Sequence, residues 1–172
     1  MTELAVSAEL VRSRTRDADA AELFAAHYPR LAGWCRNLVD DADTAHEIAA
    51  EAFTRLLAKW SSVDDPRGYL YVVAANLVRD RWRKLERERR ALRRIGPPDE
   101  LDPTPAGDVG LRVLVAALPD RLRLPVLLHY YADLPVRRVA ILLGRAEGTV
   151  KSDLFDARAR LLAQLGDRDG RT

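Results

Sequence analysis

The chain is poor in cysteine and histidine, two residue types that often build catalytic and metal sites. It has one cysteine, Cys35, and three histidines among its 172 residues. A single cysteine excludes an intramolecular disulfide, and its place in an apolar periodic segment predicts a buried thiol. The histidines have no cysteine or carboxylate at a metal-ligand spacing, and no glycine-rich phosphate loop is present. We therefore expect no catalytic residue, no enzyme activity, no cofactor and no bound metal.

Strand signals, turn residues and long apolar runs are also scarce. Glycine and proline contribute nine residues each, whereas hydrophobic residues make up 48% and charged residues 31% of the chain. This composition is typical of a folded protein, and its abundance of alanine, leucine and arginine predicts an all-α fold. No apolar run approaches the ~18 residues of a membrane span, and there is no signal peptide. We expect a cytoplasmic protein without membrane insertion.

One break in composition divides the chain into two helical domains. The segment 95–110 holds four prolines, three glycines and four acidic residues. It cannot bury enough apolar surface to fold alone, so we expect a flexible linker there. The other expected parts are a disordered N-terminus at 1–18, small helical domains at 19–94 and 111–166, and a tail at 167–172.

A helix-turn-helix is predicted within Leu134–Leu165. The first helix has one apolar face at helical spacing, made by Val136, Val139, Ala140 and Leu143. Gly144 can adopt the left-handed conformation that ends such a helix. In a DNA-binding helix-turn-helix the second helix enters the major groove. An ordinary helical hairpin with a solvated face is the alternative.

The second helix of this motif has two different faces. Its apolar stripe, expected to be buried, consists of Val150, Leu154, Ala157, Leu161 and Leu165. Its mixed polar face, expected to be available to a partner, consists of Thr149, Lys151, Ser152, Phe155 and Asp156.

A basic amphipathic helix precedes the linker. Between Arg79 and Arg94, nine basic side chains stand against three acidic ones. Asn76, Arg79, Asp80 and Arg83 follow at i, i+3, i+4 and i+7, opposite an apolar arc that runs from Leu70 to Leu85. Arginines hold phosphates and an asparagine can bond a base edge, so this face is a candidate nucleic-acid surface. A solvated charged helix is the alternative.

Two more amphipathic helices are predicted upstream, at 21–39 and 41–60. The first has an apolar side made by Leu23, Phe24, Tyr28, Leu31, Trp34, Cys35 and Leu38. The second has an acidic outer face with Asp43, Glu47 and Glu51. Such a face suits a basic partner surface. A solvated acidic face is the alternative.

The helix-turn-helix resembles region 4 of the extracytoplasmic-function (ECF) group of sigma-70 family sigma factors. The matching strings are Gly144, Glu147-Gly148-Thr149-Val150-Lys151-Ser152 and Ala157-Arg158-Ala159-Arg160-Leu161, preceded by 117–121 and 126–131. In that family, region 4 binds the −35 promoter element and the β flap of RNA polymerase. The resemblance implies −35 DNA binding by Arg145, Glu147, Gly148, Thr149, Lys151, Ser152, Phe155, Asp156 and Arg158.

The basic helix resembles regions 2.3 and 2.4 of the same family. The match lies in Tyr69-Leu70-Tyr71, Asn76-Leu77 and Asp80-Arg81-Trp82-Arg83. In the family this helix reads the −10 element, and the loop before it captures a flipped base; here that loop is 61–67, for which a plain connector is the alternative. The resemblance implies −10 DNA binding by Asn76, Arg79, Asp80, Arg83, Lys84, Ser61, Ser62, Asp64 and Arg67.

The upstream helices resemble regions 2.1 and 2.2. In the family, region 2.2 binds the clamp helices of the polymerase β′ subunit, which implies core binding by Asp43, Glu47, Glu51 and Arg55. Ala50 stands where the family usually has glutamine, which removes one polar contact. The family's linker runs toward the polymerase active centre, and a passive spacer is the alternative for 95–110.

The resemblance covers roughly 21–165, with the regions in family order. It implies a sigma factor that binds core RNA polymerase through the β′ clamp and the β flap and directs it to promoter DNA for transcription initiation. The resemblance leaves open whether an anti-sigma factor is a further partner. Two alternatives stay open: a stand-alone helix-turn-helix regulator, which leaves Arg67–Arg83 unexplained, and a sigma-like adaptor that has lost DNA binding.

Three positions in the helix-turn-helix depart from the family pattern. Asp153 and Asp156 stand where recognition helices commonly carry basic residues, and Ala146 replaces a serine or threonine cap, at an expected cost of about 1 kcal/mol. Because aspartates repel phosphates, we expect weak −35 affinity, and we expect arginine at both positions to raise it. Asp156 has the alternative of accepting a hydrogen bond from cytosine.

Overall fold

The computed structural model describes residues 2–39, 41–92 and 109–169, and this part of the chain is helical without any strand. Its elements are α1 (Thr2–Arg36), α2 (Ala42–Ala58), the 3-10 turn η1 (Trp60–Ser62), α3 (Pro66–Leu92), α4 (Val109–Ala117), α5 (Asp120–Val126), the π-helical turn η2 (Leu127–Tyr131), α6 (Val136–Leu143) and α7 (Glu147–Asp169). The predicted all-α fold is confirmed. Within the same ranges, no helix is both long and apolar enough to span a bilayer.

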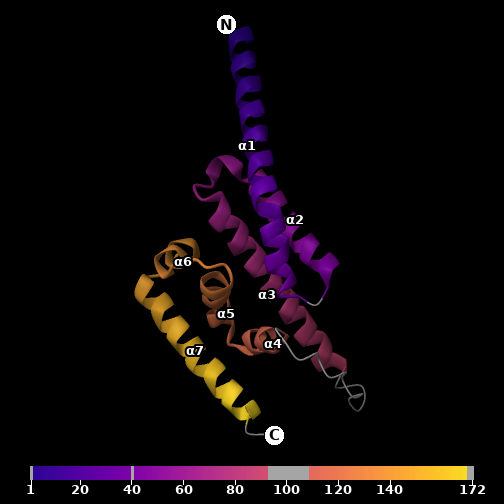
Figure 1. The fold of residues 1–172 in the computed structure, drawn as a ribbon. Coiled ribbons are helices and arrows are strands. Elements are labelled where there is room, and N and C mark those ends of the chain that lie inside the picture. The colour runs from indigo at the N-terminus through magenta and orange to yellow at the C-terminus, as the bar shows by residue number, and fades with distance from the viewer. Residues whose placement is uncertain (1, 40, 93–108, 170–172) are drawn as a thin grey trace.

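Two boundaries differ from the sequence interpretation. Helix α1 extends back to Thr2, so the structure describes residues 2–18 as helix. The predicted linker lies outside the described residues except for Val109 and Gly110, which open α4. In Figure 1 the N-terminal part of α1 projects beyond the remaining helices.

Helices α1, α2 and α3 pack together as the N-terminal half. Asp41 caps α2: its carboxylate accepts from the backbone N–H of Thr44 at 2.8 Å, and the bonds from Thr44 lower the pKa of Asp41. Trp82 donates its indole N–H to the Leu38 carbonyl at 3.0 Å and so fixes α3 against the end of α1. The predicted stripes supply the core, in which Leu31, Cys35, Leu38, Leu56, Leu70 and Val78 are at most 1% exposed.

Helices α4 to α7 form the C-terminal half and contain the predicted helix-turn-helix. Gly144 ends α6 with a φ of 61°, and the next N–H, that of Arg145, donates to the Ala140 carbonyl at 2.9 Å. This left-handed turn confirms the role predicted for the glycine. Val150, Leu154 and Ala157 are buried, but Leu165 is 43% exposed, so the predicted burial of the stripe is wrong at its last residue.

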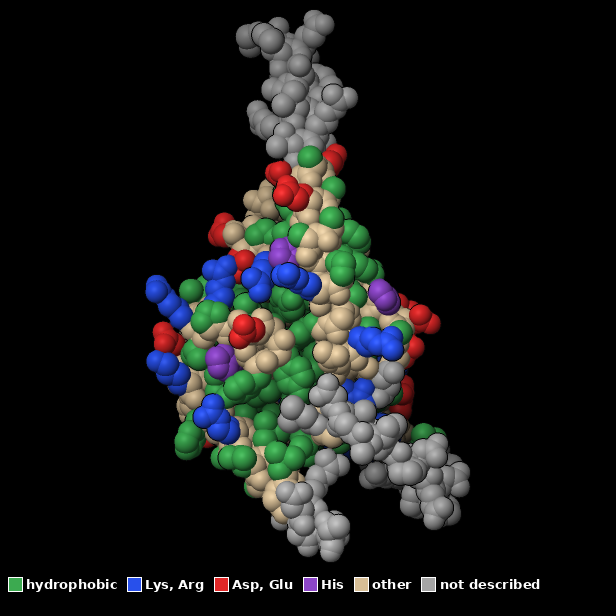
Figure 2. Space-filling model, in the orientation of Figure 1, with side chains coloured by type: hydrophobic (Ala, Val, Ile, Leu, Met, Phe, Trp, Pro, Cys, Tyr) green, Lys and Arg blue, Asp and Glu red, His purple; other side chains and the backbone are tan. Residues whose placement is uncertain are grey.

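The two halves pack against each other through α3. It contacts α5, η2 and α6, and Figure 1 shows it between α1 and α2 on one side and α5 on the other. Buried apolar side chains of both halves form one continuous cluster. On the side of the molecule that Figure 2 shows, hydrophobic side chains lie over the C-terminal half, with basic side chains along its left edge. One side of α3 is therefore covered by the second half.

Candidate nucleic-acid interface

The first turns of α7 present an open polar surface, which we call the α7 face: Thr149, Lys151, Ser152 and Phe155. All four side chains are exposed, and Phe155 is 72% exposed. Gly148 has no atom near the place of a Cβ, so no protein neighbour covers this turn. Lys151 pairs with Glu147 one turn earlier at 2.8 Å, which lowers the pKa of the Glu147 carboxyl. The predicted separation of this face from the buried stripe is confirmed.

Three other predicted −35 residues are held by contacts within the C-terminal half. Arg145 donates to Asp153 at 3.0 Å and to the Arg121 carbonyl at 3.1 Å. Asp156 accepts from Arg121 at 2.7 Å. Arg158 donates to the Tyr130 hydroxyl at 2.7 Å and lies 6.0 Å from the centroid of the Tyr130 ring. These side chains can meet DNA only by giving up or sharing these contacts.

Asp153 is buried and not exposed to solvent. It is 3% exposed, and its two oxygens accept from Arg121 at 2.5 Å and from Arg145 at 3.0 Å. Hydrogen bonds to Asp156, together with the charges of both aspartates, raise the pKa of Arg121. The interpretation of Asp153 as an exposed charge is wrong, because Asp153 joins α7 to α5 through two guanidinium groups; the effect of arginine there on −35 affinity stays a prediction. Removing a buried carboxylate that is paired in this way destabilises the folded protein.

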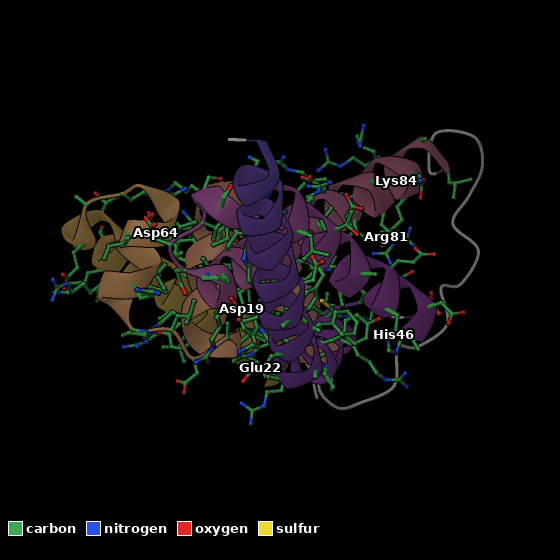
Figure 3. All side chains as sticks on the ribbon, turned by 90° about the horizontal axis from the view of Figure 1, so that it is seen from above. Asp19, Glu22, His46, Asp64, Arg81 and Lys84 are labelled. Atoms are coloured by element: carbon green, nitrogen blue, oxygen red, sulfur yellow. The ribbon has the colours of Figure 1, made fainter. Side chains whose placement is uncertain are left out.

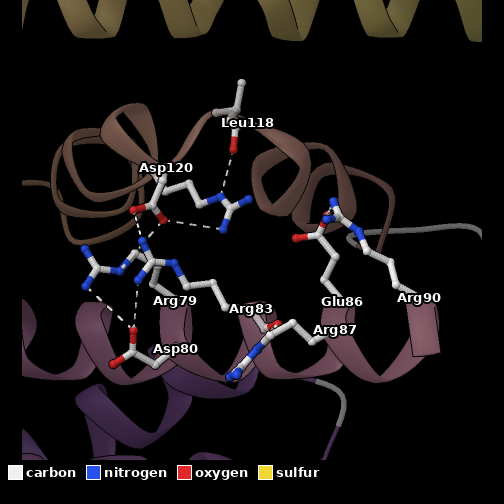
Figure 4. A network of polar contacts seen from close by, with 9 residues as sticks. Arg79, Asp80, Arg83, Glu86, Arg87, Arg90, Leu118 and Asp120 are labelled. Carbon is white, nitrogen blue, oxygen red and sulfur yellow. Dashed lines mark hydrogen bonds and ion pairs between the residues drawn. The ribbon is translucent and has the colours of Figure 1, made fainter.

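The predicted −10 residues Asn76, Arg79 and Arg83 form what we call the α3 face. It is turned toward the C-terminal half: the Arg83 guanidinium donates to the Asp120 carboxylate, and Arg79 Nε lies 4.0 Å from the same carboxylate (Figure 4). Arg79 retains 20% and Arg83 45% of its side-chain exposure. Asn76 is half-buried and donates its amide to the Val72 carbonyl at 2.9 Å. The arginines predicted to hold phosphates thus already hold a carboxylate.

The remaining predicted −10 residues are exposed, from the connection before α3 to Lys84 within the helix. Asp80 lies between the two arginines, 3.7 Å from each guanidinium, and is 60% exposed. Figure 3 shows Lys84, within α3, far from Asp64, which precedes the helix; a rise of 1.5 Å per residue separates them by about 25–30 Å. Ser61, Ser62, Asp64 and Arg67 are all exposed around the η1–α3 connection. The structure does not gather these residues into one compact site.

The predicted polymerase-binding residues share the solvent side of α2. Asp43, Glu47, Glu51 and Arg55 are all exposed, opposite the buried Ala45, Ile48, Ala49, Ala52, Phe53 and Leu56. Glu51 and Arg55 pair at 2.7 Å within one turn of helix. Ala50, the departure from the family pattern, is also exposed on this helix. This surface has free access to a partner.

An apolar groove lies at the C-terminal end of α7. It holds about 310 Å³ and is lined by Val115, Val126, Tyr130, Tyr131, Arg158, Leu161, Leu162 and Leu165. Leu162 is 62% and Tyr130 45% exposed. An apolar surface of this kind on a helical domain commonly marks a contact with another protein.

Sequence reasoning missed the residues that join the two halves. Asp120 binds the α3 face, and Arg138 of α6 pairs with Asp65 just before α3. Gly68 lies so close to α6 that a Cβ there would come within 2.9 Å of Leu142 Cδ2. The only local signal is the charge of Asp120 and Arg138, which gives no hint of partners 37 or more residues away.

Comparisons with known proteins identify the family. Two family models match in order: Sigma-70 region 2 over residues 23–88 and Sigma-70, region 4 over residues 109–161. The first covers α2 and most of α3, and the second covers α4 to α6 and most of α7. A stand-alone helix-turn-helix regulator would need only the second match.

Whole-chain comparisons agree. The chain is 30% identical to the RNA polymerase sigma-E factor of Streptomyces coelicolor, over 78% of each chain, and 25% identical to the ECF RNA polymerase sigma factor SigW of Bacillus subtilis, over 96% of this chain and 99% of that one. Two solved structures share the fold. They are the sigma factor RpoE with the anti-sigma factor NepR from Bartonella quintana (21% identity, TM-score 0.59, 86% of this chain and 97% of that one) and CnrH with the cytosolic domain of CnrY (19%, 0.63, 88% and 90%). The chain therefore belongs to the sigma-70 family, as an ECF sigma factor that directs RNA polymerase to promoters.

Proposed function

We propose that this sigma factor binds its DNA and polymerase targets through three separate surfaces. The α7 face binds the −35 element, the α3 face with the η1–α3 connection binds the −10 element, and the acidic side of α2 binds the clamp of the polymerase β′ subunit. The helix-turn-helix geometry carries the proposal. Gly144 turns the chain so that α7 begins with Thr149, Lys151 and Ser152 exposed, as a helix that enters the major groove requires.

The chemistry of the α3 face supports a second DNA contact. Arg79 and Arg83 supply guanidinium groups one helical turn apart, which suits successive phosphate oxygens. The Asn76 amide keeps its carbonyl oxygen and one N–H for a base edge, since the other N–H is bonded to Val72. Promoter opening would then draw on binding energy, without nucleotide hydrolysis or any catalytic residue.

The protein partners follow from the remaining surfaces. The acidic face of α2 complements a basic clamp surface, and the apolar groove beside Leu162 and Leu165 suits an apolar helix such as that of the β flap. An anti-sigma factor, as in the two solved complexes, would compete for such surfaces. Because the polymerase and its promoters lie in the cytoplasm, we place the protein there.

Run-off transcription with purified core polymerase tests the proposal. Core plus the full chain should initiate at specific sites on a genomic promoter library, and core alone should not. Lys151→Ala should reduce initiation at promoters that depend on a −35 element. Ala25→Ser, on an exposed position of α1 outside the three surfaces, is the matched control. Absence of specific initiation would contradict the proposed function and leave an adaptor that has lost DNA binding.

A further inference from the structure

Arg121 of α5 links the two aspartates of α7 that depart from the family pattern. Its Nη1 donates to Asp153 Oδ1 at 2.5 Å, and its Nη2 donates to Asp156 Oδ2 at 2.7 Å. Arg145, in the turn before α7, donates to the other oxygen of Asp153 at 3.0 Å. Two guanidinium groups thus face two carboxylates, and the cluster carries no net charge beside the α7 face.

Asp156 lies in line with residues of the α7 face. Thr149, Ser152 and Asp156 follow each other at i, i+3 and i+7, so they share one side of the helix. Thr149 and Ser152 are exposed, and the Asp156 side chain is 38% exposed. Asp153, by contrast, is 3% exposed. Of the two aspartates, Asp156 is therefore the one that can contact DNA.

The Asp156 carboxylate is held in place and still has free acceptor sites. Its partner Arg121 is anchored by the buried Asp153, which fixes the direction of the guanidinium fork. Oδ2 of Asp156 accepts from Arg121, whereas Oδ1 accepts no hydrogen bond from a described residue. A carboxylate oxygen has two lone pairs, so Oδ1 can accept from a ligand without breaking the contact to Arg121. An acceptor that is already ordered loses little conformational freedom on binding.

An ionised carboxylate only accepts hydrogen bonds, which restricts the bases that it can read. In the major groove cytosine presents its N4 amino group as a donor, whereas guanine presents the acceptors N7 and O6. Adenine places the acceptor N7 beside its amino group, and thymine presents an acceptor and a methyl group. Cytosine is therefore the base that suits Asp156. Its ion pair with Arg121 offsets the repulsion that a lone aspartate would meet from the flanking phosphates.

We propose that Asp156 is a specificity-determining residue that reads a cytosine in the −35 element, and that Arg121 is its positioning residue. The proposal rests on the assignment of the α7 face to the −35 element, and it deepens that assignment by naming a base and its acceptor. The two aspartates then have separate roles. Asp153 anchors Arg121 from inside the protein, and Asp156 contacts the base.

Selection from a promoter library tests the base preference. Holoenzyme reconstituted from core polymerase and the full chain is mixed with duplexes that have a fixed −10 element and a randomised −35 region, and the bound fraction is sequenced. We expect the wild type to enrich cytosine roughly tenfold at one position, the order of a base-edge contact. Asp156→Ala should lose the enrichment at that position alone. Asp156→Asn should change the preference to adenine, whose N6 and N7 pair with an amide.

Asp133→Asn is the matched control for charge. Asp133 is exposed in the same half, has no ion pair to a described residue, and has a φ of 53°, which asparagine adopts as readily as aspartate. D133N removes the same unit charge as D156N and should keep the cytosine enrichment. Loss of the enrichment in D133N as well would show that net charge sets the preference and would overturn the base contact.

The positioning role of Arg121 needs a measurement that a purely structural role would not change. Arg121→Lys keeps the positive charge beside Asp153 but lacks the planar fork that holds both carboxylates. We expect it to lower the cytosine enrichment by about two- to fivefold, the range of an exposed ion pair, and to leave the other −35 positions unchanged. An equal loss at every −35 position would make Arg121 a residue of the fold alone and would overturn its positioning role.

The outcomes separate this inference from the proposed function. If the wild type and Asp156→Ala select the same −35 sequence, the base contact fails while the −35 assignment stands. A preference for a base other than cytosine at the position that responds to Asp156→Ala also overturns the inference. If the wild type selects no −35 sequence, the assignment of the α7 face fails, and the inference fails with it.

Discussion

The two nucleic-acid faces of this protein differ in what covers them. The α7 face is open to solvent, and its neighbours Arg145 and Asp156 are engaged only within their own half. The α3 face is partly covered by the other half, with its arginines on Asp120 (Figure 4). Both faces contain the polar residue types expected of DNA-binding helices. Residue types therefore identify a DNA-binding helix, but its availability depends on long-range packing.

The difference has a physical origin in how each helix is supported. Helix α7 is fixed from one side, by α4, α5 and α6, so its opposite side stays exposed. Helix α3 is packed by α1 and α2 on one side and by α5, η2 and α6 on the other. The part of α3 between the two layers therefore has little surface to offer, whereas its residues from Asp80 onward are mostly exposed.

Disrupting the ion pairs of Asp153, which hold α7 against α5, should give the largest effect on stability. Asp153→Arg replaces a buried acceptor with a third cation beside Arg121 and Arg145. We expect a loss of about 3 kcal/mol in the free energy of unfolding of the C-terminal half, the lower end of the range for a buried pair because Arg121 is half-exposed. Urea denaturation followed by circular dichroism measures it, and −35 duplex binding should fall. Lys151→Ala, exposed on the same helix, should stay within about 0.5 kcal/mol in stability. Tighter −35 binding by D153R would restore the interpretation of a phosphate-repelling aspartate.

The contribution of the α3 face to promoter recognition should be measurable as base selectivity. In holoenzyme, Asn76→Ala should lower discrimination at one −10 base by about 1–3 kcal/mol, because a base-edge contact is lost. Arg83→Ala should instead weaken binding to all promoters and reduce the salt dependence. Promoter-competition assays at two salt concentrations measure both effects. An equal loss on every promoter for N76A would reassign Asn76 to helix packing, consistent with its bond to Val72.

The α2 surface provides a comparison that does not depend on which DNA face is covered. Glu47→Lys with Glu51→Lys reverses two exposed charges without touching the core, so the helix content should not change. We expect holoenzyme assembly to weaken by roughly 1 kcal/mol or more, mainly through a slower association rate. Competition with labelled wild type for core polymerase measures this, with Asp19→Lys and Glu22→Lys on α1 as a control of equal charge. Core affinity equal to that of the control would remove α2 from the interface.

The smallest effect concerns the start of the α7 face. Ala146 precedes the first residue of α7 and offers no side-chain acceptor for its free N–H groups. Ala146→Ser should stabilise the C-terminal half by about 1 kcal/mol with little change in −35 affinity. Thermal unfolding gives the stability change. A variant no more stable than wild type would mean that these N–H groups are satisfied by water at no net cost.

The parts of the fold that depend on neighbouring residues could be predicted from the sequence. The left-handed turn at Gly144 and the buried stripe from Val150 to Ala157 follow from local backbone and helical periodicity. The same periodicity wrongly predicted that Leu165 is buried. Periodicity does not reveal where the packed neighbours of a helix end, and beyond that point the helix is exposed.

The ion pairs could not be predicted, because their partners lie far along the chain. Asp153 looks like an exposed charge in its own helix, and only the fold brings Arg121, 32 residues earlier, to its oxygen. Likewise, the spacing of Arg79 and Arg83 places them on one face, but nothing near them in sequence points to Asp120. Charged residues close to each other in space but far apart in sequence are the class of contact that periodicity leaves out.

Arginine reactivity tests the contrast between the two faces most directly. Free chain and holoenzyme without DNA would be treated with phenylglyoxal under native conditions, and modification at each arginine followed by mass spectrometry. Arg81, exposed on the same helix as Arg79 and Arg83, is the internal reference. The account predicts that Arg79 and Arg83, which contact Asp120, react more slowly than Arg81 in the free chain; their rates in the holoenzyme show whether core binding exposes the α3 face. Equal reactivity of the three arginines in the free chain would contradict it.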